Sequence, residues 1–199
     1  QFSASRMTAR KAIDQIVELG MLERVPSVGT FVKASTAQSS LLEIKNIATE
    51  IKARGHQHRM TVLSKMTLAP NESLVLSMSS LHTSVFKIII IHFENDIPIQ
   101  LEERYVNAEK APLFLEQDFS KITAHEYLSS IVPLTEAEIA IEAIMPTDIL
   151  KHNLAIGDNT PCLKVSRSTH YDGYPISFAI LYYPADKYKL TSTISSKKE

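Results

Sequence analysis

Five side chains near the start of the chain carry the chemistry that proteins use on DNA. They are Ser5, Arg6, Thr8, Arg10 and Lys11, all within seven residues. Hydroxyl groups and a helix N-terminus bind phosphate oxygens, and an arginine guanidinium can reach phosphates or the edge of a guanine. The same residue types also suit an ordinary solvated helix surface, so these residues alone leave both interpretations open.

The elements that would position these side chains are a helix and a hairpin. Apolar residues recur at three- and four-residue spacing, which predicts one buried helix face, and Gly20 follows where a left-handed C-cap is expected. Two short strands, at 21–25 and 30–33, flank a tight turn, and Gly29 with Thr30 would let the backbone approach DNA closely. A helix followed by such a hairpin is typical of the second half of a winged helix.

Beyond the hairpin the pattern changes twice. Residues 35–40 are small and polar without periodicity, which predicts a linker, and a helix is expected from residue 41 to Arg54. Later segments alternate as strands do, with few helices between them. Strands are predicted at 60–68, 85–93, 97–106, 136–144, 161–171, 175–183 and 187–193, and short helices at 112–119, 124–131 and 147–154. This order predicts an α+β domain with an antiparallel sheet over 41–199, after a partial DNA-binding domain over 1–34.

The composition limits the other classes of function. The 199 residues carry a net charge of −1, which argues against a wholly basic surface but leaves room for one basic patch. No apolar stretch is long enough to cross a bilayer and no signal-peptide pattern opens the chain, so we expect a cytoplasmic protein without a membrane partner. The seven histidines lack metal-ligand spacing, and the single cysteine, Cys162, lies in an apolar strand-like segment. Since nucleophile and phosphate-loop motifs are also absent, we expect no metal, no cofactor and no catalytic residue.

Three early blocks resemble the winged-helix signature of the GntR family of bacterial transcription regulators: Ser5–Ala12, Glu18–Leu22 and Gly29–Val32. The resemblance implies that Ser5, Arg6, Thr8 and Arg10 lie on the recognition helix and that Gly29 and Thr30 lie in the wing. Lys11 is added to these candidates because it lies beside Arg10. Ser27 departs from the family's usual glycine in the wing turn. The helices that precede this one in the family are missing from the sequence, so we expect the 199-residue chain to bind DNA poorly.

Three later blocks resemble the UTRA effector-binding domain of the HutC subfamily: Ile97–Val106, Gly157–Leu163 and Tyr183–Tyr188. Residues 40–56 are similar to the segment that opens this domain in histidine-utilization repressors. Ala185 and Lys187 stand where glycine and arginine are usual. The resemblance implies a chorismate-lyase-like fold and a small-molecule effector, which is urocanate for the histidine-utilization repressors.

The resemblance and the residue types together select five candidate effector contacts: His92, Glu102, Arg104, Thr123 and Tyr188. Arg104 and the helix start at Thr123 suit the carboxylate of urocanate. Glu102 matches an effector-contacting position of the family and could accept an imidazole N–H, while His92 and Tyr188 would complete the polar lining. Glu102 and Arg104 share one strand face, however, and could simply pair with each other, and His92 could be a core histidine.

Two positions on one predicted strand bear on the identity of the effector. Sugar-phosphate sensors of this domain type carry two arginines where this chain has Ile90 and His92, so a phosphosugar effector is not expected.

The preferred hypothesis is a homodimeric repressor of histidine-utilization genes that binds operator DNA and is relieved by urocanate. The alternatives are a regulator of the same family that senses another small molecule, and a chorismate-lyase-like enzyme.

Overall fold

The computed structural model describes residues 6–18, 22–25, 29–32, 37–40, 46–70 and 83–191. They fall into two compact units, residues 1–36 and residues 37–199, and each is described by itself. The features predicted at Ser5, Gly20 and Ser27, and the part of the second predicted helix before Asn46, lie outside the described residues. No helix in the described ranges is long and apolar enough to span a bilayer.

The first unit contains the predicted helix and hairpin. Helix α1 runs from Arg6 to Glu18, and strands β1 (Leu22–Val25) and β2 (Gly29–Val32) pair antiparallel. An ion pair between Asp14 of α1 and Arg24 of β1 links the helix to the hairpin. These elements confirm the prediction of a helix followed by a short hairpin.

The second unit is built on a six-stranded sheet. Its strands are β4 (His58–Leu68), β5 (Val85–Glu94), β6 (Ile97–Asn107), β7 (Glu136–Ile144), β8 (Cys162–Tyr171) and β9 (Tyr174–Pro184). They lie in the order β4-β5-β6-β9-β8-β7, and every neighbouring pair is antiparallel. The two tight hairpins turn at Asn95–Asp96 and Asp172–Gly173, where all four residues have positive φ, as short turns between twisted strands require. The predicted α+β domain with an antiparallel sheet is therefore confirmed.

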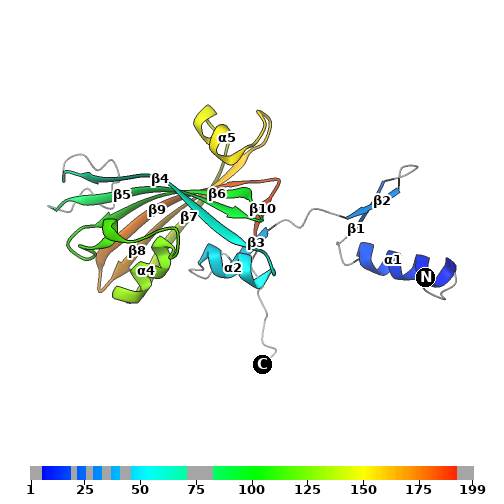
Figure 1. The fold of residues 1–199 in the computed structure, drawn as a ribbon, viewed down its shortest axis with the longest axis horizontal. Coiled ribbons are helices and arrows are strands. Elements are labelled where there is room, and N and C mark those ends of the chain that lie inside the picture. Colours follow the sequence, from blue (N-terminus) through cyan, green and yellow to red (C-terminus); the bar gives the residue numbers. More distant parts are fainter. Residues whose placement is uncertain are drawn as a thin grey trace, which may run out of the picture. The chain divides into compact units, whose positions relative to one another are not determined.

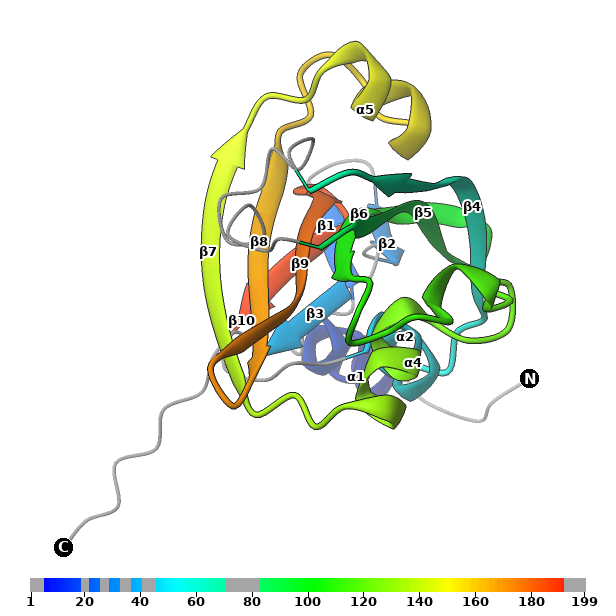
Figure 2. The same ribbon diagram turned by 90° about the vertical axis from the view of Figure 1, so that its left-hand side faces the viewer.

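Helices cover both faces of this sheet (Figure 1). Helix α5 (Asp148–Leu154) packs against Ile91 and Leu101 on one face. Helices α2 (Ile47–Ala53) and α4 (Ala124–Ile131) pack on the other, which we call the inner face. Figure 2 shows both helices beside the curved sheet, with α5 away from them.

The inner face includes every second residue of the central strands. Ile88 and Ile90 of β5 pack into the core under α4, and Leu181 of β9 and Val165 of β8 pack with α2. Gln100, Glu102 and Arg104 of β6 share this face because they alternate with Leu101, which packs toward α5. The inner face therefore combines two apolar clusters with a row of polar side chains.

Three segments differ from the sequence-based expectation. The helix predicted from residue 41 to Arg54 begins only at Ile47, because Asn46 is extended and its side chain caps the first turn. In 112–119 only Phe114–Glu116 (η1) is helical, as a single 3-10 turn. Phe114 and Phe119 are both buried with their rings 4.9 Å apart, whereas in a regular α-helix positions five residues apart point about 140° away from each other. Within the predicted linker 35–40, Ala37–Ser40 forms strand β3, which pairs in parallel with β10 (Tyr188–Thr191). Backbone hydrogen bonds alone can recruit such a polar segment, so its lack of periodicity gave no signal.

Candidate functional site

Three of the predicted effector residues meet on the inner face. Glu102 accepts hydrogen bonds from its two neighbours: Oε1 from Nε of Arg104, and Oε2 from Nε2 of His92 at 3.0 Å. His92 is fully buried, and Glu102 and Arg104 are nearly so. The alternative that Glu102 and Arg104 pair with each other is therefore what the structure contains, and His92 is a buried histidine bonded to a carboxylate.

Electrostatics keep Glu102 ionised in this buried position. Burial alone would raise the pKa of Glu102, but the positive charge of Arg104 and the hydrogen bond from His92 outweigh it and hold the pKa well below its usual range. An ionised carboxylate only accepts hydrogen bonds, so Nε2 of His92 is the donor. The cluster is thus a buried ion pair oriented by a histidine.

The cluster extends in both directions along the sheet. Nε2 of His58 lies 3.0 Å from Nδ1 of His92, and the two rings stack with centroids 5.3 Å apart. Burial and the neighbouring His92 lower the pKa of His58 to about 4. At the other end, Nη1 of Arg104 donates to the hydroxyl of Ser177 at 3.2 Å, and Ser177 lies 2.8 Å from the Thr169 hydroxyl. The network therefore spans four strands, β4, β5, β6 and β9, and reaches β8.

Tyr188 belongs to a second polar group on the same face. Its hydroxyl donates to Oε2 of Glu50 at 3.1 Å, and its ring stacks on Tyr183 with centroids 4.0 Å apart. The amide Nε2 of Gln100 donates to the Tyr183 hydroxyl. Burial raises the pKa of Tyr183 above its usual range, so this hydroxyl stays neutral. The group joins α2, β6, β9 and β10.

Arg167 also belongs to the inner face, and the sequence analysis did not select it. On β8 it is level with Ala179 of β9, which is level with Arg104 of β6. It is only 7% exposed, and its Nε has no hydrogen-bond partner among the described residues. Burial and the charge of Arg104 lower its pKa, with smaller influences from Tyr183, Glu102 and Glu50. The sequence alternation could have revealed it. Arg167 follows the apolar Val165 by two residues, so both side chains are expected on the same inward face of the strand, where a charge is unusual.

Thr123 is buried but serves its own helix. As the N-cap of α4 its hydroxyl oxygen accepts from the backbone N–H of Glu126 at 3.0 Å, as the sequence predicted for a helix start. In the described part of the chain, no hydrogen bond or ion pair joins Thr123 to either polar group. The structure thus brings together His92, Glu102 and Arg104, places Tyr188 in the neighbouring group, and leaves Thr123 at the end of α4.

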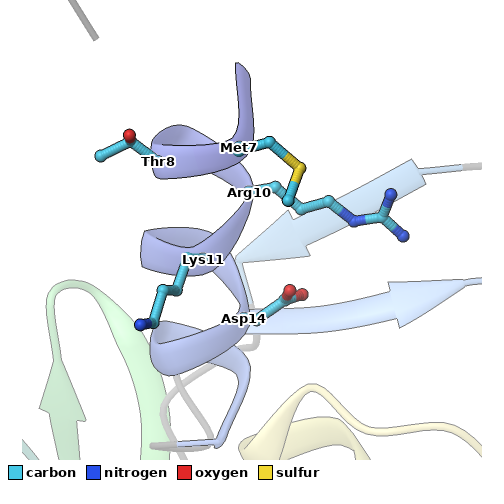
Figure 3. Close-up of a pocket in the computed structure, with 5 residues that line it drawn as sticks. All are labelled: Met7, Thr8, Arg10, Lys11 and Asp14. Carbon is cyan, nitrogen blue, oxygen red and sulfur yellow. The ribbon is translucent and has the colours of Figure 1, made fainter. Parts of the chain in front are cut away.

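The predicted DNA-contacting side chains lie in the other unit. Thr8, Arg10 and Lys11 are exposed on α1, where they line a shallow hollow with Met7 and Asp14 (Figure 3). Thr8 and Lys11 point to one side of the helix, whereas Arg10 points to the other, as Met7 and Asp14 do.

The remaining predicted DNA contacts lie at the start of the helix and in the hairpin. Arg6 begins α1, and Thr30 is exposed on β2 beside Gly29, whose φ of +148° favours glycine. The chemistry expected of these residues on DNA stays a prediction. No cluster of three or more potential metal ligands occurs among the residues that can be described.

Comparisons with known proteins place the chain. The UTRA domain model matches residues 53–189. The chain is 40% identical to the histidine utilization repressor of Pseudomonas aeruginosa over 198 residues, which are 98% of this chain and 79% of that protein. The crystal structure of the C-terminal domain of the histidine utilization repressor from Pseudomonas syringae pv. tomato superimposes with a TM-score of 0.66 at 35% identity, covering 70% of this chain and 100% of that one. PhnF from Mycobacterium smegmatis shares the fold over 99% of this chain and 88% of its own, with a TM-score of 0.83 at 19% identity. The chain therefore belongs to the histidine utilization repressors, transcriptional repressors of the GntR family that carry a UTRA domain.

Proposed function

We propose that this chain senses urocanate on the inner face of its sheet and that urocanate weakens operator binding by the repressor of histidine-utilization genes. The observation that carries the proposal is the buried network of His92, Glu102 and Arg104 in a member of this family. Such a network costs desolvation energy that a purely structural core would avoid, and it holds donors and acceptors for a small polar ligand in place.

The chemistry of the inner face matches urocanate better than a phosphosugar. Ile90 carries no charge and is fully buried in the apolar cluster under α4, and Nε2 of His92 already donates to Glu102, so neither side chain replaces the arginines of the sugar-phosphate sensors. Urocanate is flat, partly apolar, and carries an imidazole at one end and a carboxylate at the other. Apolar clusters flanked by histidine, glutamate and arginine side chains provide partners for each of these parts.

The five effector residues keep proposed roles. Glu102 accepts the ligand's imidazole N–H on a lone pair that its two partners leave, and Arg104 and His92 hold Glu102 in position. The Tyr188 ring lines the site, and the Thr123 hydroxyl, whose oxygen caps α4, donates its hydrogen to the ligand. In the other unit, side chains of α1 and the wing bind operator DNA, and two-fold symmetry of a homodimer would match a palindromic operator.

Isothermal titration of the chain with urocanate tests the effector, with histidine and glucosamine 6-phosphate as controls. We expect saturable binding of urocanate and none of the phosphosugar. Thr123→Val should weaken this binding, whereas Thr147→Val, which removes the matching N-cap of α5, should lower stability by about the same 1 kcal/mol and leave the Kd unchanged. No urocanate binding by the folded chain would refute the effector.

Two more measurements test the rest of the proposal. Chromatography of urocanate after long incubation should recover it unchanged, whereas a product would favour the lyase-like enzyme. In the full-length repressor, urocanate should lower operator affinity; binding without any such change would contradict the proposed coupling.

A further inference from the structure

We infer that Arg167 is the cation that binds the carboxylate of the effector, rather than Arg104, the arginine that the sequence alone favours. The inference rests on the proposed function in one respect, the identity of the ligand. The chemical class it requires is a small organic acid whose carboxylate reaches Arg167 on the inner face.

Arg104 and Arg167 differ in the partners that they already have within the protein. Arg104 forms an ion pair with Glu102 and donates to Ser177 at 3.2 Å. Arg167 is only 7% exposed, yet it forms no ion pair with a described residue, and its buried Nε has no hydrogen-bond partner among them. A buried guanidinium without an acceptor is costly, and an anionic ligand that supplies two oxygens in the plane of its fork would offset that cost.

The position of Arg167 suits this role. It lies on β8, level with Ala179 and Arg104, and on the face of the sheet that carries the apolar cluster packed under α2. Ala179, which has a small side chain, lies between Arg104 and Arg167 in this row. Titratable side chains of both polar groups influence Arg167: Arg104 and Glu102 belong to one group, and Tyr183 and Glu50 belong to the other.

A second unpartnered atom on the inner face narrows the class of acid. Oε1 of Gln100 is buried and has no hydrogen-bond donor among the described residues. Arg167 therefore offers a donor and Gln100 an acceptor, both from the inner face of the sheet. An acid that also carries an N–H group has an acceptor on this face in Gln100 as well as in Glu102, whereas a simple carboxylate uses only the donor of Arg167.

The test compares urocanate with its neutral methyl ester by isothermal titration of the wild type, Arg167→Met and Lys164→Met. Lys164 is the matched control because it lies on the same strand but belongs to the opposite face, where it pairs with Glu142. We expect the Arg167→Met substitution to raise the Kd of urocanate about 30-fold or more. The variant should then bind urocanate and its methyl ester with nearly equal affinity. Wild type and Lys164→Met should both prefer the acid. Wild-type affinity in Arg167→Met would overturn the inference.

Folding is checked on the same samples. Arg167→Met removes an unpaired buried charge, so its Tm without ligand should equal or exceed that of the wild type. If it does not fold, Arg167→Lys keeps the charge but loses the fork, and it should retain the preference for acid over ester with a weakened Kd. Equal binding of acid and ester by a folded Arg167→Lys would then overturn the inference.

A measurement of Tm in acetate tests the carboxylate site independently of the proposal that urocanate is the effector. At equal ionic strength, acetate should raise the Tm of the wild type and of Lys164→Met relative to chloride, but not that of Arg167→Met. If urocanate does not bind and acetate behaves in this way, the carboxylate site stands and the urocanate proposal fails. If neither compound affects the wild type, Arg167 is satisfied by water and the inference is wrong.

Discussion

Helix α1, which is predicted to contact DNA, and the inner face of the sheet place their charges in opposite surroundings. On α1, Arg10 and Lys11 are exposed, and even the apolar Ile13 and Ile16 are 38% and 37% exposed. On the inner face, Arg104 and Glu102 are buried beside fully buried aliphatic side chains. Exposed charges attract phosphates at little cost in folding energy and are screened by salt, whereas buried charges interact strongly and must be paired. Substitutions on α1 should therefore act weakly and independently, and those on the inner face strongly and together.

Removing the carboxylate of Glu102 should have the largest effect and is the strongest test of this difference between buried and exposed charges. Glu102→Ala leaves Arg104 buried without its ion-pair partner and removes the acceptor for His92. We expect the free energy of unfolding, measured with urea, to fall by about 3–5 kcal/mol. Glu142→Ala is the control, because it removes a pair with Lys164 whose glutamate is 56% exposed, and it should cost about 1 kcal/mol or less. Similar losses in both variants would contradict the distinction between buried and exposed charges.

Apolar substitutions extend the comparison to packing. Ile88 is fully buried under α4, so Ile88→Ala should lower the free energy of unfolding of the sheet by about 2–5 kcal/mol. Ile13→Ala on α1 should change it by less than about 0.5 kcal/mol, because Ile13 belongs to the other unit and is partly exposed. Hydrogen exchange provides the readout: amides of β5 and β6 should be strongly protected and those of α1 weakly. Protection of α1 equal to that of β6 would show that the two regions are not energetically distinct.

The smallest expected effect concerns pH. The pKa of His58 is lowered to about 4 in the folded chain, while the unfolded chain takes up the proton near its ordinary value of about 6.5. His58 thus contributes stability above about pH 6.5, and that contribution is lost as the pH falls toward 4. The difference in unfolding free energy between wild type and His58→Asn should shrink by about 1–2 kcal/mol between pH 7.5 and pH 4.5. His152→Asn, an exposed control on α5, should show no such narrowing, and a constant difference for His58→Asn would contradict the assignment.

Local patterns in the sequence were sufficient for most elements. Alternation and turn residues placed β5, Asn95–Asp96 and β6, and hydroxyl caps placed α4 and α5, because these signals act within a few neighbouring residues. The segment around Phe114 was mispredicted because packing against Phe119, rather than local preference, decides its backbone. The pairing of β3 with β10 was missed because no side-chain periodicity reports a backbone contact between residues about 150 positions apart.

The sequence by itself determined the class of the protein and the chemistry of its candidate contacts: three motif blocks on each side of residues 35–40, and Glu102 and Arg104 on one strand face. Only the tertiary structure decided how those charges are distributed. It neutralised Arg104 with Glu102 and oriented Glu102 with His92 from the next strand. It also brought Arg167, about 60 residues later in the chain, into the same row with no partner for its Nε among the described residues. The physical reason is that the strength of a charge depends on its burial and on its neighbours across the sheet, and the order of the strands sets both.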